Sequence, residues 1–253
     1  MALFHISMRS DSLGMSTNLY VILPSDTSSV PEDGYPVLYL LHGLSDDHTK
    51  WLRATRIEEY ALRYNLCVVM PEVQCSFYTN MKNGLFYDDY ITKDLPAFIE
   101  KTFPVTKKRE KTFIAGLSMG GFGAVKTGLR EHQKFAACAG LSAVTHPFEQ
   151  LENADEGRMR LARSILGDDS KLAERDDPYT LASLQTLLPE SDRTRLYLAI
   201  GTEDFLYDDN RRFRAHLDRL GLSYVYEEGP GSHNWDFWDE YIQHALRFFF
   251  EEK

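Results

Sequence analysis

A serine flanked by glycines is the strongest sign of chemistry in this sequence of 253 residues. Ser118 lies in the run Gly116-Leu117-Ser118-Met119-Gly120, which follows an apolar segment and continues into small residues. This pattern is typical of a nucleophile elbow, a tight strand-to-helix turn that lifts a serine above a parallel sheet. Gly116 and Gly120 would provide the steric clearance that such a turn needs. Because a Gly-x-Ser-x-Gly string also arises by chance, the rest of the chain decides its meaning.

A serine hydroxyl needs an imidazole to take its proton and a carboxylate to orient that imidazole. In folds that alternate strands and helices, the expected chain order is serine, acid, histidine. Asp204 follows a strand-like apolar run, and His233 lies in the loop before the last predicted helix, so we predict that Ser118, Asp204 and His233 form a catalytic triad. The competing carboxylates near Asp204 are Glu203, Asp208 and Asp209. The last two better fit the first turn of the next helix, where they meet the helix dipole favourably.

The tetrahedral intermediate of such a reaction needs N–H donors that are held in place beforehand. One expected donor is the backbone N–H of Met119, the residue after the nucleophile. The loop after the apolar run over 37–41 reads His42-Gly43-Leu44, which makes the backbone N–H of Leu44 the second expected donor. Gly43 would permit the bend. We expect His42 to hold this loop and not to act as a base.

Strand and helix patterns alternate along the chain and predict the scaffold for these loops. Strand patterns cover residues 2–8, 17–23, 37–41, 67–70, 112–115, 135–141, 196–200 and 223–228. Helical spacing of apolar residues covers 57–64, 91–103, 121–130, 210–220 and 235–250. The alternation predicts an α/β fold with a mostly parallel, doubly wound sheet and helices on both faces. The first two strands are expected to add an antiparallel pair at one edge.

The segment over residues 146–192 breaks this alternation. It is charged and mostly helical, is interrupted by prolines, and offers no obvious central strand. We expect a single domain over residues 1–253 in which this segment is a helical cap insertion. A cap in that place would lie at the carboxyl ends of the strands, where ligands bind in open α/β sheets. The alternative is a surface excursion with no part in the pocket.

Composition narrows the class of protein further. A net charge of −10 with one short basic cluster argues against a nucleic-acid partner. No stretch approaches the roughly 20 apolar residues of a membrane span, and no secretion signal is visible, so a cytoplasmic location is expected. A homo-oligomer is left open.

The cysteines argue against a disulfide framework and a thiolate metal site. Cys67, Cys75 and Cys138 are odd in number, widely spaced and without a Cys-x-x-Cys pair. We expect free thiols in or near the core, and no metal.

Four motifs in a fixed order carry a specific resemblance. They are 41–47 with Trp51, 116–121, 201–204 and 232–235. Together they make the sequence similar to the esterase D family of α/β-hydrolases over about residues 17–250, most closely to tributyrin esterases. The resemblance implies an α/β-hydrolase fold, a serine carboxylesterase that hydrolyses short-chain acyl esters through an acyl-enzyme, a small-molecule ester as substrate, and no cofactor.

The resemblance also suggests where substrate binds. The segment over 76–81, followed by Gly84 and Tyr87, looks like the tributyrin-esterase subgroup and would border the pocket. The expected pocket aromatics are Trp51, Phe77, Tyr78 and Trp235, although the two tryptophans could equally pack in the core. For Trp238, on the apolar face of the last predicted helix, core packing is favoured.

Other functions share the same elbow and triad. The family includes S-formylglutathione hydrolases, feruloyl and acetyl-sugar esterases, and mycolyltransferases, which transfer acyl groups to an acceptor other than water. Outside catalysis, the scaffold could serve as a binding protein. The presence of all three predicted triad residues favours an enzyme.

Overall fold

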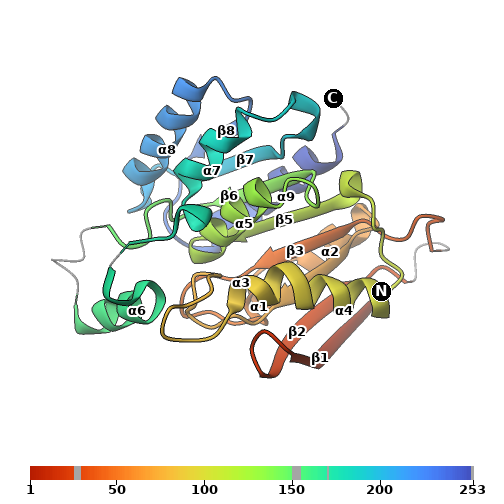
Figure 1. Cartoon of the computed structure of the whole chain (residues 1–253). Helices are drawn as coiled ribbons and strands as arrows, with labels where there is room; N and C mark the ends of the chain where they lie inside the picture. Colours follow the sequence, from red (N-terminus) through yellow and green to blue (C-terminus); the bar gives the residue numbers. More distant parts are fainter. Residues whose placement is uncertain (26–29, 150–154, 170, 252–253) are drawn as a thin grey trace.

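A computed structural model describes residues 1–25, 30–149, 155–169 and 171–251. Within these residues an eight-stranded sheet forms the centre of the molecule (Figure 1). Its strands are β1 (Ala2–Ser10), β2 (Met15–Leu23), β3 (Val37–Leu41), β4 (Cys67–Pro71), β5 (Thr112–Leu117), β6 (Ala137–Leu141), β7 (Arg195–Gly201) and β8 (Val225–Gly229). Their spatial order is β1-β2-β4-β3-β5-β6-β7-β8.

The sheet is parallel from β4 to β8 and antiparallel at the edge that β1 and β2 form. Strands β3, β5 and β6 are buried along their whole length, which explains why their sequences are continuous apolar runs and do not alternate. The predicted doubly wound α/β fold with an antiparallel edge is confirmed.

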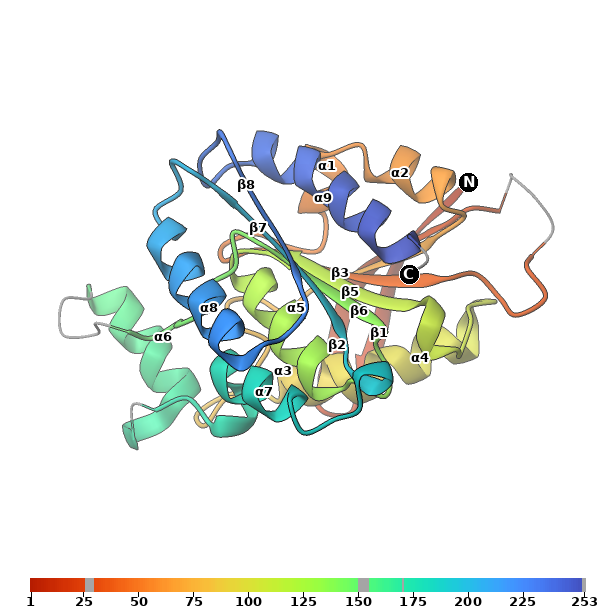
Figure 2. The ribbon, with the colours of Figure 1, turned by 90° about the horizontal axis from the view of Figure 1, so that it is seen from above.

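Helices cover both faces of the sheet. The α-helices are α1 (Lys50–Ala54), α2 (Ile57–Arg63), α3 (Tyr87–Asp89), α4 (Leu95–Thr102), α5 (Met119–Arg130), α6 (Glu156–Leu166), α7 (Pro178–Gln185), α8 (Tyr207–Leu220) and α9 (Trp235–Phe250). Figure 2 shows α1, α2 and α9 on one face, and α4, α5, α7 and α8 on the other. Each face buries its own hydrophobic cluster against the sheet.

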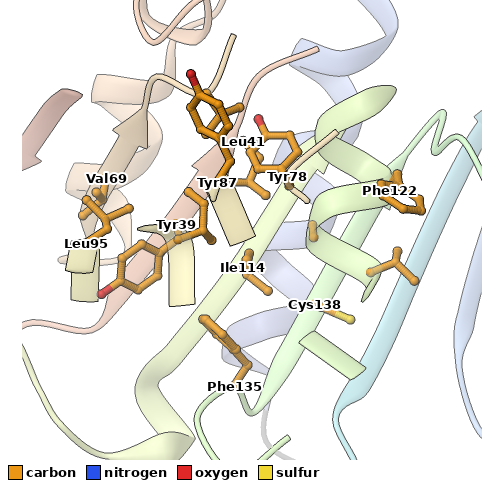
Figure 3. Packing of buried hydrophobic residues seen from close by; sticks show 14 of the residues in the cluster. Tyr39, Leu41, Val69, Tyr78, Tyr87, Leu95, Ile114, Phe122, Phe135 and Cys138 are labelled. Atoms are coloured by element: carbon orange, nitrogen blue, oxygen red, sulfur yellow. The ribbon is translucent and has the colours of Figure 1, made fainter. Parts of the chain in front are cut away.

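The larger cluster lies between the sheet and the layer of α4, α5, α7 and α8. Figure 3 shows part of it, with Tyr39 and Ile114 on the strands and Phe122 on α5. Cys138 is buried in this cluster and Cys67 is buried as well, but Cys75 is exposed, so the expectation of thiols in or near the core holds for Cys67 and Cys138 and is wrong for Cys75. Cys75 falls in the loop after β4, where the chain has already left the sheet.

The helix predicted over 91–103 differs from the structure in its first half. A π-helical turn (Tyr90–Asp94) precedes α4, and Pro96 lies in the first turn of α4. Proline has no N–H to donate back along the helix, which favours a wider turn just before it. A single π-helical turn shifts the helical register by only about one residue, so periodicity over this short stretch gives no sign of it.

The insertion after β6 contains α6, α7 and short 3-10 turns, among them Glu174–Asp176. Helix α6 stands apart from the sheet in both views (Figures 1 and 2). Its carboxyl end is attached to the loop before α3, because the N–H groups of Lys82 and Asn83 donate to the carbonyls of Ile165 and Ser164. Helix α7 packs against α5, the helix that begins just after Ser118.

Candidate active site

Ser118 occupies the sharp turn between β5 and α5. Its φ of +54° is a strained value for a residue with a side chain. Two backbone hydrogen bonds hold this turn. The Ser118 N–H donates to the Leu141 carbonyl at 2.9 Å, and the Ser118 carbonyl accepts the Val144 N–H at 3.2 Å. The backbone therefore fixes the serine before any substrate arrives.

The flanking glycines are required by close backbone approach. A Cβ on Gly116 would lie 2.3 Å from the carbonyl oxygen of Gly120, and a Cβ on Gly120 would lie 2.4 Å from that of Leu41. Both distances are below any real contact of this kind, and the obstructing atoms are backbone. A side chain at Gly116 would push the start of α5 away from β5, and one at Gly120 would push it away from the end of β3.

Ser118, His233 and Asp204 form one hydrogen-bonded chain. The Nε2 atom of His233 is 3.0 Å from the Ser118 Oγ, and its Nδ1 atom is 2.9 Å from Oδ2 of Asp204. Asp204 is buried, whereas His233 is half-buried and Ser118 reaches the surface of a cavity. The Asp204 carboxylate also accepts the Leu206 N–H at 2.9 Å, which fixes its orientation. The structure thus brings together three residues that are more than 28 positions apart in sequence.

The competing carboxylates have other partners. Glu203 accepts the Gly231 N–H and joins the two loops that carry Asp204 and His233. Asp208 is exposed in the first turn of α8, and Asp209 accepts the Thr145 N–H at 2.9 Å. Their places agree with the preference for Asp204.

His42 holds the loop after β3. The Val73 N–H donates to its Nε2 at 3.2 Å, so the ring proton is on Nδ1, which donates to the Gly43 carbonyl at 2.8 Å. Burial lowers the pKa of His42, and this effect exceeds the opposing ones of the Gly43 carbonyl and the Glu72 carboxylate. A neutral imidazole with both nitrogens engaged has no free site for proton transfer.

A cavity of about 500 Å³ opens at Ser118. Leu44 and Met119, the residues whose N–H groups were expected to bind an oxyanion, both line it. The other apolar lining residues are Phe77, Val144, Pro147, Phe148, Leu161, Phe205 and Leu206. The polar ones besides Ser118 are His146, Glu149, Arg158, Asp208, Asp209 and Arg212. Residues of the insertion over 146–192, among them His146, Phe148 and Leu161, therefore border the cavity.

Of the four aromatics expected at the pocket, one lines the cavity and three do not. Phe77 lines the cavity as expected. Tyr78 instead lies in the core beside Leu41 (Figure 3), where its hydroxyl donates to the His42 carbonyl at 2.8 Å. Trp51 is buried behind the site, with its indole N–H donating to the Leu41 carbonyl at 2.9 Å, and Trp235 packs edge-on against Trp51. Buried Tyr and Trp need a partner for their polar atom, and here backbone carbonyls behind the loop provide it.

The structure also adds residues that the sequence analysis did not assign to the site. Phe205 packs against His233 with ring centroids 4.5 Å apart, and its position directly after Asp204 was an available signal. The insertion supplies Phe148 and Leu161, for which spacing gave no signal because the insertion lacks a regular pattern. Trp238 is buried, as predicted, but its ring also meets His233 edge-on at 4.9 Å.

The part of the chain that the structure describes contains neither a side-chain cluster suited to a metal ion nor a helix suited to crossing a membrane. No group of three or more His, Cys, Asp or Glu side chains there could hold a metal ion. Across those same ranges, no helix has the length and apolar character needed to cross a membrane.

The fold and this hydrogen-bonded chain define the class. A serine on a strand-to-helix elbow of a doubly wound sheet, with a histidine and an acid from later loops, is the arrangement of α/β-hydrolases that act as serine hydrolases.

Comparison with known proteins gives the family. The model of the esterase family, described as "Putative esterase", matches residues 10–249. An acetyl esterase of Caldicellulosiruptor saccharolyticus is 32% identical over 261 aligned positions, which cover 98% of each chain. The chain belongs to the esterase family and is a serine carboxylesterase; the resemblance to the esterase D family is confirmed.

Solved structures agree. FphF, a fluorophosphonate-binding serine hydrolase of Staphylococcus aureus, superposes with a TM-score of 0.88 at 36% identity over 99% of both chains. The S-formylglutathione hydrolase FrmB of Staphylococcus aureus gives a TM-score of 0.83 at 36% identity, over 98% of this chain and 99% of the other. The whole described scaffold, insertion included, is therefore shared with serine hydrolases.

Proposed function

We propose that this protein hydrolyses short-chain acyl esters, with Ser118 as nucleophile, His233 as general base and Asp204 as the residue that orients the base. One observation carries this proposal. The two ring nitrogens of His233 are engaged at the same time, Nε2 at 3.0 Å from the Ser118 Oγ and Nδ1 at 2.9 Å from the Asp204 carboxylate. This is the geometry that nucleophilic catalysis by serine requires.

The reaction follows from these positions. Ser118 Oγ attacks the ester carbonyl carbon while His233 Nε2 takes its proton, and Asp204 stabilises the imidazolium that forms. The negative charge on the carbonyl oxygen is held by the backbone N–H groups of Leu44 and Met119. When the C–O bond breaks, His233 returns the proton to the leaving alcohol. Water then attacks the acyl-enzyme in the same way and releases the acid.

The cavity supports a small, mostly apolar substrate. Its volume of about 500 Å³ lies within the range of small-molecule sites, and apolar side chains such as Phe77, Met119 and Val144 line it together with Ser118. Charged side chains, including Glu149 and Arg212, complete the lining. A long acyl chain would have to lie against these charges and remove water from them, which is costly. The cavity therefore favours acetyl and other short acyl groups.

A hydrolysis series tests the proposal. We expect p-nitrophenyl esters from acetate to palmitate to be cleaved with a maximum at short chains, and Ser118→Ala to lose this activity. The exposed Ser191→Ala is the matched control and should behave as the wild type. Activity retained by folded Ser118→Ala, or a folded wild type that is silent on every ester, would refute the proposal.

The second candidate substrate is a thioester. It is supported by the similarity to FrmB, which is named an S-formylglutathione hydrolase and is 36% identical. The same nucleophile would attack a thioester carbonyl, so the triad does not separate the two. Comparing kcat/KM for S-formylglutathione with that for the best p-nitrophenyl ester would decide which class is preferred.

A further inference from the structure

All three tryptophans of the chain lie in one row that ends at His233. The rings of Trp51 and Trp235 meet edge-on with centroids 5.1 Å apart, those of Trp235 and Trp238 at 5.2 Å, and those of Trp238 and His233 at 4.9 Å. Each of the three contacts has an interplanar angle of 88° or 89°. Edge-to-face packing is a favoured geometry for aromatic pairs, so each ring restrains the next.

The first and the last tryptophan of this row are fixed to the sheet. The Trp51 indole N–H donates to the carbonyl of Leu41, the last residue of β3 and the one before the His42-Gly43-Leu44 loop. The Trp238 indole N–H donates to the Ser142 hydroxyl at 3.0 Å, just after the end of β6. The row thus joins the strand that leads into the His42-Gly43-Leu44 loop to the imidazole of His233.

Ser142 is itself held firmly. It is fully buried, has a φ of +46°, and its N–H donates to the Ala199 carbonyl on β7 at 2.7 Å. A buried residue with a side chain keeps a positive φ only where its surroundings enforce it. The acceptor for the Trp238 indole is therefore a fixed point of the sheet.

His233 needs such support because its surroundings are partly exposed to solvent. His233 is half-buried, and Phe205, which covers it from another side, is 76% exposed. The imidazole turns about its Cα–Cβ and Cβ–Cγ bonds, and on a half-buried side chain the hydrogen bonds to Asp204 and Ser118 are the polar restraints on this motion. A buried ring packed edge-on against the imidazole restricts that rotation.

We propose that Trp238, anchored by Ser142, is a positioning residue that fixes the plane of the His233 imidazole. This inference rests on the proposed role of His233 as the base. Trp238 is not among the residues that line the cavity, and it contacts His233, Trp235 and Ser142, so it acts on the reaction through the histidine.

The test compares Trp238→Leu with Phe249→Leu. Both remove a buried aromatic ring from α9, but Phe249 stacks on Phe113, away from His233. We expect Trp238→Leu to lower kcat on a short p-nitrophenyl ester roughly tenfold or more, with KM nearly unchanged, because misplacing the base costs rate and not ground-state binding. Phe249→Leu should lower the melting temperature but leave kcat near the wild-type value.

The Ser142 anchor has its own test, which also serves if Trp238→Leu fails to fold. Trp238→Phe keeps an aromatic ring but removes the indole N–H, and Ser142→Ala removes its acceptor. Each should lower kcat a few-fold, and the double variant should be no worse than the poorer single variant, since both break the same bond. Losses that multiply in the double variant would overturn the role of Ser142.

The proposal is overturned if Trp238→Leu keeps the wild-type kcat, or if Phe249→Leu lowers kcat as much as Trp238→Leu does. These outcomes are distinct from failure of the proposed function, in which the wild type itself would not cleave the ester.

Discussion

Helix α5 carries two buried polar clusters, one at each end, and they are built in opposite ways. Its amino end follows Ser118, whose hydroxyl faces a cavity and has His233 as its partner. Nearer its carboxyl end, Lys126 is fully buried, and its ammonium group donates to Asp88 and Asp176 at 2.8 Å each. In the first cluster the Ser118 hydroxyl is accessible from the cavity, whereas in the second the Lys126 side chain is fully enclosed.

The second cluster connects three segments of the chain. Arg130, one turn after Lys126, also binds both Asp88 and Asp176, and Arg175 adds a bond to Asp88. Asp88 lies in α3, and Asp176 lies in the 3-10 turn (Glu174–Asp176) of the insertion. The insertion that borders the cavity is thus tied to the helix that begins at the nucleophile.

The two clusters differ in how completely their polar groups are covered and paired. At Ser118 the groups are few and only partly covered, as a reacting site must be. Around Lys126 each carboxylate has at least two cationic partners, which offsets the cost of removing charge from water. Substitutions should therefore reduce activity at one end of α5 and stability at the other.

The largest expected effect is at the reactive end. Asp204→Asn should lower kcat/KM by roughly 10³- to 10⁴-fold, because the amide cannot hold His233 in the tautomer that accepts a proton at Nε2. Glu203→Gln is the matched control, since this neighbouring carboxylate binds the Gly231 N–H and not His233. Steady-state kinetics measure both, and an equal loss in the two variants would break the assignment of the acid.

The next effect is on stability. Lys126→Met should reduce the free energy of unfolding by about 3–5 kcal/mol, because it leaves two buried carboxylates short of a partner. Lys93 pairs with Asp89 at 2.9 Å but is exposed, so Lys93→Met should cost less than about 1 kcal/mol. Urea denaturation compares the two. If both variants lose the same small free energy of unfolding, the buried cluster around Lys126 stabilises the fold no more than the exposed pair of Lys93 does, which would contradict the account.

A smaller effect depends on pH. Burial by itself raises the pKa of Asp88, but the charges of Lys126 and Arg130 outweigh burial and lower it to about 2. Since the ordinary value is 3.8, ionised Asp88 contributes about 2 kcal/mol that is fully present above about pH 4 and is lost as the pH falls towards 2. The Asp88→Asn variant should lack this part of the acid destabilisation. Equal acid sensitivity of wild type and variant, by urea denaturation at several pH values, would contradict this.

The smallest expected effect is on substrate binding at the reactive end of α5. Phe205 lines the cavity and packs on His233, yet it is largely exposed. Phe205→Ala should raise KM for aryl esters by about two- to fivefold with little change in kcat, as expected when contacts to substrate and transition state are lost equally. A large fall in kcat would show instead that this ring also positions the base.

The cluster at Ser118 could be predicted from the sequence because each of its residues belongs to a short local motif. Parallel strands end at the same edge of a sheet, so residues directly after strand patterns, such as Ser118 and Asp204, were expected to meet there. The glycines around Ser118 had a steric reason that the close approach of Gly120 to Leu41 bears out. The order of the strands and of α2, α4, α5, α8 and α9 followed from hydrophobic spacing, whereas the short helices α1 and α3 were not predicted.

The cluster around Lys126 could not be predicted in this way. Its partners Asp88 and Asp176 are 38 and 50 positions away, and a lysine within a helical pattern gives no sign that it is buried. The positions of Trp51 and Tyr78 could not be predicted for a similar reason. Trp51 and Tyr78 are near the site in sequence, but which way each ring turns depends on the carbonyls of Leu41 and His42, which only the assembled fold brings to them.

The most direct test of the central claim is covalent labelling. The protein is treated with a fluorophosphonate, its intact mass is measured, and the modified peptide is identified, with Ser118→Ala alongside. We predict one adduct per chain, on Ser118, and none on the variant, because the serine activated by His233 is the nucleophile. An adduct on a different residue, or a folded wild type that does not react, would contradict the account.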